Sequence, residues 1–229
     1  MTQFGRVIDL DRCTGCQACA AACSVENSCS TETPWQVVQK YEVGKYPNVR
    51  ENFVPMGCMH CEDAPCEKVC HEIDVHAITT NEYGVVIFDY DKCIGCGYCE
   101  PVCPYGVPQF QNKRETLYPD KDPTPYEAIP VENQHPLHRK KSGIAQKCTS
   151  CWHKIEKAIA DDKIERVGID PEYTPSCDLV CPVDARVFGD LDDANSKVSK
   201  WIGEKKAGQM KKEYGTSPRV FYVSSGGDY

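Results

Sequence analysis

The sequence of 229 residues contains no long apolar run, and no stretch approaches the 18 residues that a membrane-spanning helix requires. Its start, MTQFGRVIDLDRC, has neither the basic opening nor the apolar core of a secretory signal, so we expect none. Positive charge is scarce, since 26 Lys and Arg face 34 Asp and Glu, and the net charge is −8. Because nucleic acid needs a basic surface, a nucleic-acid-binding function is not expected.

Apolar residues make up only 41% of the chain, so something besides apolar burial is expected to stabilise it, and cysteine is present in excess. The odd number of 17 cysteines and their spacing argue against a simple disulfide framework. Cys29 stands alone and is interpreted as an idle thiol rather than as an out-of-register ligand. The others form four groups of four, which are Cys13, Cys16, Cys19 and Cys23; Cys58, Cys61, Cys66 and Cys70; Cys93, Cys96, Cys99 and Cys103; and Cys148, Cys151, Cys177 and Cys181.

The first and third groups have the C-x2-C-x2-C-x3-C spacing of bacterial ferredoxins, and Pro104 follows the third group. With this spacing, three thiolates on one tight loop bind a [4Fe–4S] cluster, and the fourth cysteine binds a second cluster. Gly15, Gly95 and Gly97 suit a loop that bends sharply beside the inorganic core. The alternatives are zinc or disulfides, with zinc most plausible at the fourth group, whose two cysteine pairs are far apart in the sequence.

The exchange of the fourth cysteine, together with the internal symmetry of the groups, predicts which cysteines share a cluster. Groups two and three are close in the sequence and should form one two-cluster unit, which leaves groups one and four for the other. Four [4Fe–4S] clusters are therefore expected. Their ligands are Cys13, Cys16, Cys19 and Cys181 for cluster 1; Cys23, Cys148, Cys151 and Cys177 for cluster 2; Cys58, Cys61, Cys66 and Cys103 for cluster 3; and Cys70, Cys93, Cys96 and Cys99 for cluster 4.

The expected fold class is α+β, with two intertwined bacterial two-cluster ferredoxin-like modules, long connecting loops and a C-terminal extension. The segments GRVIDLDRC and GVVIFDYDKC each combine a short apolar strand, an Asp-rich turn and a ligand loop, which indicates an internal repeat. Module A is assigned to residues 1–30 and 145–190, and module B to residues 50–106. The connecting, partner-facing loops are assigned to 31–49 and 107–144, and a C-terminal helix and extended arm to 191–229.

Local patterns predict a hairpin that joins residues 75–79 to 85–88, and helices over 152–161 and about 194–212. The proline-rich residues 107–147 predict an extended loop, and TSPRVFYV predicts an extended arm. The basic run HRKK at 138–141 is interpreted as a solvated surface or a docking site for an acidic partner. The cysteine sets leave no ligand position vacant, so the histidines near the cluster loops are interpreted as hydrogen-bonding or surface residues; they are His60, His71, His76 and His153.

Over nearly its whole length the chain resembles the four-cluster iron–sulfur subunits of the molybdopterin oxidoreductase (dimethyl sulfoxide reductase) superfamily. The segments that carry the resemblance are VIDLDRCTGCQACAAAC, VGKYPNV, CMHCEDAPC, CIGCGYCEPVCPYG, CTSCWHKIEKA and GTSPRVFY. The chain is most similar to the shorter members that serve polysulfide or thiosulfate, tetrathionate, arsenate and dimethyl sulfoxide reductases. It lacks the C-terminal membrane helix of the formate dehydrogenase subunit. Cys96 is retained where the nitrate reductase subunit has tryptophan, so the resemblance implies four [4Fe–4S] clusters and no three-iron cluster.

The resemblance implies a subunit that performs no substrate chemistry and has no catalytic residues. It would relay electrons in anaerobic respiration between a catalytic subunit holding molybdenum or tungsten bis-pyranopterin and a quinone-reactive membrane subunit or a soluble carrier such as a cytochrome. Cluster 1 would face the catalytic subunit and cluster 4 would lie at the exit, with clusters 2 and 3 between them. Residues 107–147 depart from the family pattern.

Several members of this family carry no signal and are exported, already folded, with a catalytic partner that bears a twin-arginine signal. The implied location is therefore the periplasm or the outer face of the cytoplasmic membrane, and the alternative is the cytoplasm. An independent soluble polyferredoxin is the alternative function. About 70 residues in long connections and another 40 or so after Cys181 favour an obligate interface, because a shuttle needs little beyond its ferredoxin units.

Overall fold

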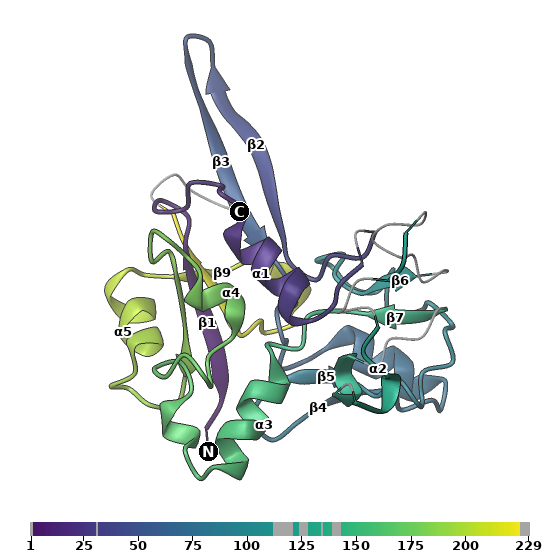
Figure 1. The fold of residues 1–229 in the computed structure, drawn as a ribbon. Coiled ribbons are helices and arrows are strands. Elements are labelled where there is room, and N and C mark those ends of the chain that lie inside the picture. The colour runs from purple at the N-terminus through teal and green to yellow at the C-terminus, as the bar shows by residue number, and fades with distance from the viewer. Residues whose placement is uncertain are drawn as a thin grey trace.

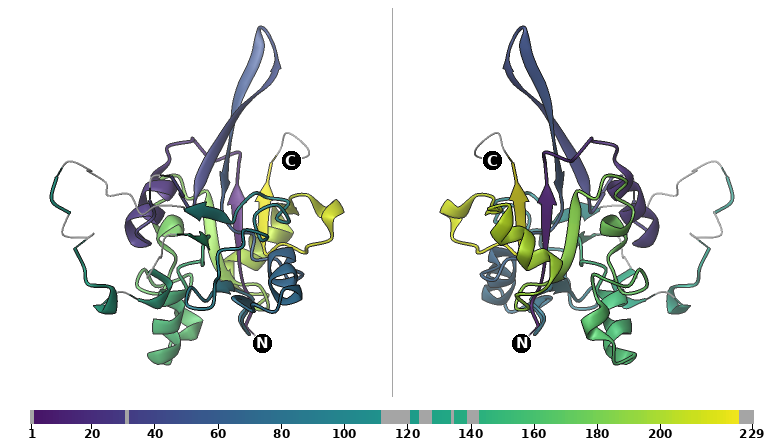
Figure 2. Two further views of the ribbon diagram at one scale, coloured as in Figure 1. Left: turned by 90° about the vertical axis from the view of Figure 1, so that its right-hand side faces the viewer. Right: turned by 90° about the vertical axis from the view of Figure 1, so that its left-hand side faces the viewer.

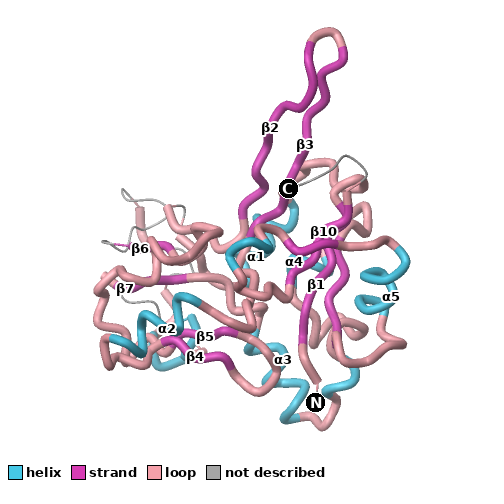
Figure 3. Tube along the Cα trace, turned by 180° about the vertical axis from the view of Figure 1, so that it is seen from behind, coloured by secondary structure: helices cyan, strands magenta, loops and turns pink. Residues whose placement is uncertain are grey.

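The computed structural model describes residues 2–30, 32–111, 121–123, 128–133, 135–138 and 143–224. A four-stranded sheet has the strand order β8-β1-β10-β9. The strands span Arg186–Asp190 (β8), Phe4–Asp9 (β1), Val220–Val223 (β10) and Gly208–Gln209 (β9). β1 pairs antiparallel with β8 and parallel with β10, so strands from the two ends of the chain lie side by side (Figures 1 and 3).

The C-terminal segment completes this sheet. The expected extended arm at 216–223 contains β10, and this strand is part of the sheet rather than an appendage to it. All six residues of β1 are buried, so the hydrogen-bonding groups on both of its edges need partners. β8 satisfies one edge and β10 the other, and β10 buries Val220 and Tyr222 in doing so.

Helix α5 spans Lys197–Glu204, so the helix expected over about 194–212 is too long. The helix begins after Ser196, whose Oγ accepts a hydrogen bond from the backbone of the first turn. It ends because Lys206 adopts a positive φ of 51° and the Ala207 N–H turns back to the Ile202 carbonyl oxygen. The chain then continues into β9 and a short 3-10 turn, η4 at Lys212–Tyr214.

The other helices carry or adjoin the cysteine groups. Helix α3 at Trp152–Ala160 confirms the helix expected over 152–161. The remaining ones are α1 at Ala18–Glu26, α2 at Pro65–Glu72 and α4 at Ser176–Leu179. A 3-10 turn, η3 at Ile164–Arg166, lies between α3 and α4. In the described part of the chain, none of the helices combines the length and the apolar character that crossing a membrane would take.

The predicted hairpin after group two is confirmed, shifted by a few residues. Strand β4 at Ile78–Thr80 pairs antiparallel with β5 at Val86–Phe88. Asn81 shapes the turn, because its Oδ1 accepts hydrogen bonds from the N–H groups of Tyr83 and Val85.

The β4–β5 hairpin repeats the β8–β1 pair, as the two similar segments predict. Asp9 accepts hydrogen bonds from the two N–H groups before its cysteine loop, and Asp89 does the same in the other half. The Asp9 N–H donates to the Ala185 carbonyl oxygen at 2.7 Å, and the Asp89 N–H donates to the Ala77 carbonyl oxygen at 2.7 Å. The two halves are therefore related residue by residue, with β1 matching β5 and β8 matching β4.

A long hairpin projects from the body of the molecule (Figures 1 and 2). Strand β2 at Val37–Lys45 pairs over its full length with β3 at Asn48–Met56. The assignment of residues 31–49 to a connecting loop is therefore wrong, and the module boundary at residue 50 falls inside β3. β-branched and aromatic residues favour extended structure on both sides of the Tyr46-Pro47 turn, which accounts for the hairpin.

The connection at 107–147 holds little regular structure in its described part, as expected. Strand β6 at Gln109–Gln111 pairs with β7 at Ile144–Gln146, and two 3-10 turns, η1 and η2, lie at Val131–Asn133 and Pro136–His138. Most of the basic run at 138–141 lies outside the described residues, so its two interpretations stay open.

Candidate cluster-binding sites

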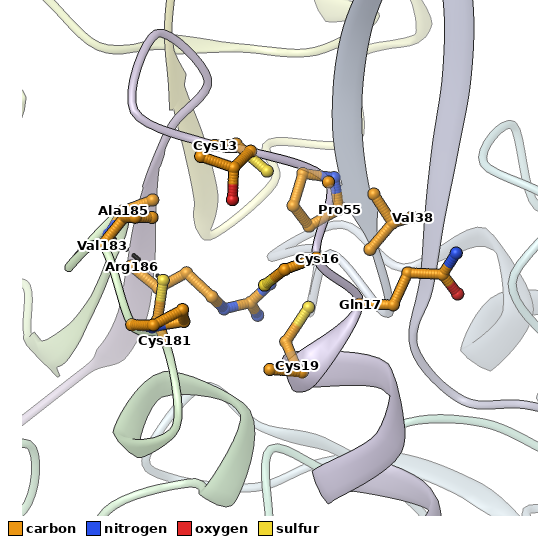
Figure 4. Close-up of a pocket in the computed structure, with 14 residues that line it drawn as sticks. Cys13, Cys16, Gln17, Cys19, Val38, Pro55, Cys181, Val183, Ala185 and Arg186 are labelled. Atoms are coloured by element: carbon orange, nitrogen blue, oxygen red, sulfur yellow. Dashed lines mark hydrogen bonds between the residues drawn. The ribbon is translucent and has the colours of Figure 1, made fainter.

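The predicted ligands of cluster 1 surround one hollow of about 330 Å³. Cys13 and Cys16 lie on the loop between β1 and α1, Cys19 lies in the first turn of α1, and Cys181 follows α4 (Figure 4). The hairpin supplies Val38 and Pro55 as apolar parts of the same wall. Cysteines 162 residues apart in the sequence (181 − 19) thus meet at one site.

Two further hollows of similar size are each lined by a predicted set. One of about 350 Å³ is lined by the predicted ligands of cluster 3, Cys58, Cys61, Cys66 and Cys103. The other, of about 360 Å³, is lined by the predicted ligands of cluster 4, Cys70, Cys93, Cys96 and Cys99. Three hollows with the same four-sulfur lining suit the same kind of occupant.

The predicted ligands of cluster 2 are all buried, and side chains between them mark where they meet; they are Cys23, Cys148, Cys151 and Cys177. The Asn27 amide nitrogen lies 3.6 Å from Cys23 Sγ and 3.9 Å from Cys151 Sγ. Burial raises the pKa of Cys151, and the nearby sulfurs of Cys177 and Cys148 raise it further. The four sulfurs therefore share one buried region.

The chemistry of these sites fits iron–sulfur clusters. Burial, followed by neighbouring sulfurs, raises the pKa of Cys61 and of Cys99 to about 12, so both thiols are neutral until a cation displaces their protons. Within the described residues, no three Cys, His, Asp or Glu side chains stand close enough to hold a single metal ion. Sulfurs spaced around a hollow suit a multi-iron cluster better than one zinc ion.

Backbone N–H groups point at the sulfurs in a pattern that repeats between the halves. The N–H groups of Ala77 and Ala185 donate to Cys70 and Cys181 at 3.2 and 3.3 Å. In the same way, Cys58 and Cys148 each accept from the residue two positions later, at 3.4 and 3.3 Å. Such bonds stabilise the negative charge of a liganding thiolate and tune the cluster potential.

Two of the predicted glycines are required by close approach as well as by conformation. Gly15 and Gly95 have φ values of 68° and 75°. A Cβ at Gly15 would overlap the ring of Phe53, and one at Gly95 would overlap the Gly143 carbonyl oxygen. Gly97 shares the positive φ, at 78°, but nothing lies within 4 Å of where its Cβ would be.

The four sites differ in exposure, and neighbouring sites share helices. Cys16 and Cys96 are the exposed cysteines of the described chain, so the first and fourth sites open to the surface. Ile94 and Tyr98, beside Cys96, are 70% and 54% exposed. The first and second sites share helix α1, which carries Cys19 and Cys23, and the third and fourth share α2, which carries Cys66 and Cys70.

The histidines and Cys29 lie around the sites. His60 accepts a hydrogen bond from the Val86 N–H at its Nδ1, and His71, His76 and His153 contact the Ile78 carbonyl oxygen, Asp74 and Glu26. Cys29 lies near Cys23, and their hydrogen bond, ahead of burial, raises the pKa of Cys23.

The structure also brings buried charges to the sites that the sequence analysis did not single out. They are Arg6, Lys147, Asp178 and Arg186. The one signal available was Arg6 itself, a charged residue in the middle of an otherwise apolar strand.

Models of iron–sulfur domain families match the chain at these groups. Two different 4Fe-4S dicluster domains match residues 49–118 and 85–157, and a 4Fe-4S binding domain matches residues 6–26.

Curated relatives match the chain almost from end to end. A protein of Halobacterium salinarum, provisionally named as an iron–sulfur subunit of dimethyl sulfoxide reductase, is 37% identical over 98% of this chain and 80% of its own length. The arsenate respiratory reductase iron–sulfur subunit of Shewanella sp. strain ANA-3 is 36% identical over 98% of this chain and 97% of its own. A subunit of the selenate reductase of Mesobacillus selenatarsenatis is 35% identical over 97% of this chain and 72% of its own.

Proposed function

The chain belongs to the family of 4Fe-4S iron–sulfur subunits of respiratory oxidoreductases, and on this premise we propose that it relays electrons through four [4Fe–4S] clusters. It works beside a catalytic subunit that holds molybdenum or tungsten bis-pyranopterin. Electrons pass between that subunit and a quinone-reactive membrane subunit or a soluble redox carrier. The relay serves anaerobic respiration, and the chain itself performs no substrate chemistry.

The observation that carries this proposal is the meeting of cysteines from distant groups. In three hollows, three cysteines come from one short stretch of chain and the fourth from another cysteine group; these fourth ligands are Cys181, Cys103 and Cys70. That exchange is the mark of paired clusters in two-cluster ferredoxins. It supports the sixteen ligands named above and two intertwined ferredoxin-like modules, each of which holds two clusters.

The exposure of the sites supports which clusters lie at the two ends of the path. The first and fourth clusters lie where Cys16 and Cys96 reach the surface, so they are the points of entry and exit. We assign the first cluster to the catalytic partner and the fourth to the membrane subunit or carrier. The periplasm, or the outer face of the cytoplasmic membrane, is the proposed location, with export beside the catalytic partner.

The residues of this chain hold and insulate the clusters. The sixteen thiols bind iron as thiolates, the backbone N–H groups at Ala77 and Ala185 stabilise thiolate charge, and buried apolar side chains exclude water. When bound, each cluster supplies one-electron redox chemistry. The protein sets each potential through burial, local charge and hydrogen bonds to sulfur.

Anaerobic native purification with analysis of iron, molybdenum, tungsten and zinc tests the proposal. We expect about 16 iron atoms on this chain, from four cubanes, and a large companion subunit containing molybdenum or tungsten. A brown chain that retains its iron but purifies alone, without a pterin metal, would indicate a free polyferredoxin instead. A colourless chain loaded with zinc would overturn both functions.

A further inference from the structure

Two buried arginines and one buried aspartate stand beside the sulfur of Cys177. The Arg6 guanidinium donates to both carboxylate oxygens of Asp178, at 2.7 to 3.0 Å, and Arg186 Nε donates to the same carboxylate at 3.0 Å. Nη2 of Arg6 lies 3.6 Å from Cys177 Sγ, and Nη2 of Arg186 lies 3.4 Å from it. We name Arg6, Asp178 and Arg186 the charged triad. Its side chains are at most 3% exposed.

The charged triad carries a net charge of +1 in a buried site, where screening by solvent is weak. The Asp178 carboxylate accepts hydrogen bonds from both guanidiniums, so each charge is compensated by an opposite charge at hydrogen-bond distance. All three groups are therefore charged at neutral pH. Two positive charges and one negative charge remain beside the sulfur.

The internal repeat provides a comparison within the same chain. By the pairing of β1 with β8 and of β5 with β4, Arg6 matches Val86 and Arg186 matches Ile78. Both of these residues are buried and apolar. The residue that matches Asp178, Glu67, binds Thr80 instead of an arginine. The same strand pair therefore forms without the charges.

Burying ion pairs is costly, and apolar replacements of similar volume are often as stable or more so. Since Val86 and Ile78 occupy the matching positions, the fold does not require charge there. The two halves differ instead in the charges beside the cysteine sulfur. When a cluster is reduced, its negative charge increases. Reduction of a bound cluster adds one electron and breaks no bond, which changes its charge from about −2 to about −3 with the thiolates counted.

We propose that the charged triad raises the reduction potentials of the first two clusters. Electrons are then held on these two clusters, at the end of the relay where Arg186 lines the hollow of the first cluster. The inference rests on the proposed electron relay. Arg6 and Arg186 both contact Cys177, a ligand of the second cluster. Arg186 also lines the hollow of the first cluster, where Figure 4 shows its side chain reaching between Cys181 and Cys19. Arg6 therefore acts on one cluster, and Arg186 acts on two.

The test is a potentiometric titration of the purified complex, followed by electron paramagnetic resonance, for the wild type and three variants. Arg6→Gln should lower the potential of one of four centres and Arg186→Gln that of two. Asp178→Asn should raise potentials, because it removes the negative charge. We expect about a tenfold change in the reduction equilibrium of the cluster bound to Cys177, or about 59 mV for one electron. Arg166→Gln, which removes the same charge from an exposed ion pair with Asp170, is the control and should move no centre.

Opposite shifts in Arg186→Gln and Asp178→Asn, with iron content unchanged, would support the proposal, because a merely structural role cannot reverse sign. If Arg186→Gln loses iron, Arg186→Lys and Asp178→Asn decide whether the proposal holds. Arg186→Lys should keep the reduction equilibria of both clusters within about threefold of wild type. Unchanged potentials in iron-replete variants would overturn this inference and leave the relay standing. A wild-type chain without clusters would overturn both.

Discussion

Cys58 and Cys148 are packed in one buried cluster of side chains together with Trp35. In the proposed ligand sets, Cys58 belongs to the third cluster and Cys148 to the second. This contact is therefore the point where the two halves bring their clusters together. With the helices that each pair of sites shares, it supports a path through the first, second, third and fourth clusters in that order.

Replacing Cys96 by serine tests the exit of this path. Cys96 is exposed at the fourth site, so the variant should perturb the fourth cluster and leave the others intact. Electron transfer between the complex and the quinone or carrier should stop. Activity of the catalytic subunit with artificial donors or acceptors should be largely unaffected. If both activities fell equally in an assembled complex, the order of clusters would be wrong.

Replacing Gly95 by alanine tests the close approach at the fourth site. The new Cβ would overlap the Gly143 carbonyl oxygen and would strain a backbone with φ of 75°. We expect the loop to shift and the iron content to fall by about four atoms, one cubane. Gly97→Ala has the same positive φ but open space, so it should cost only about 1 kcal/mol of strain and keep its iron. Equal iron loss in the two variants would show that conformation, rather than contact, is what matters.

Replacing Cys29 by alanine tests whether this seventeenth cysteine is a ligand. Cys23 completes the expected spacing, and Cys29 lies beside it. Cys29→Ala should keep about 16 iron atoms and all four electron paramagnetic resonance signals, whereas Cys23→Ala should lose the second cluster. The reverse outcome would assign the ligand to Cys29.

Replacing Glu26 by glutamine tests the ion pair that joins α1 to α3. Oε1 of Glu26 lies 2.7 Å from Nε2 of His153, and Oε2 accepts from the Ser176 hydroxyl at 2.6 Å. The hydrogen bond with His153 is the main reason that the pKa of Glu26 falls to about 2; burial opposes this fall, and Ser176 and Lys154 assist it. At pH 7 the variant should lose about 1 to 2 kcal/mol of unfolding free energy, because a hydrogen bond to a charged group is removed.

The pH dependence of this loss follows from the lowered pKa. A depressed carboxyl pKa contributes stability above the unfolded value of about 4.3 and loses it as the pH falls toward 2. The part of the difference between wild type and Glu26→Gln that comes from the ionisation of Glu26 should therefore be fully present above about pH 5 and shrink as the pH falls toward 2. Thermal unfolding followed by circular dichroism measures it. Glu156→Gln, at an exposed pair with His135, should change stability by less than about 0.5 kcal/mol at every pH.

The sequence by itself determined what depends on short spacing. Cysteines three or four positions apart must share a loop or one helical turn. The ligand groups and the kind of cofactor that they bind can therefore be predicted from the sequence before the fold is known. Helix α3 and the β4–β5 hairpin are legible for the same reason, because each is formed by contacts within a few residues.

Tertiary structure alone decided what depends on distant partners. β10 is an interior strand because β1, at the other end of the chain, has an edge to satisfy, and the 37–56 hairpin forms part of the wall of the first site. The sequence shows that Arg6 is a charged residue in an otherwise apolar strand, but its role depends on Asp178 and Cys177, some 170 residues away. A buried charge is stable only where the fold brings a compensating charge beside it, and no local pattern specifies where that will be.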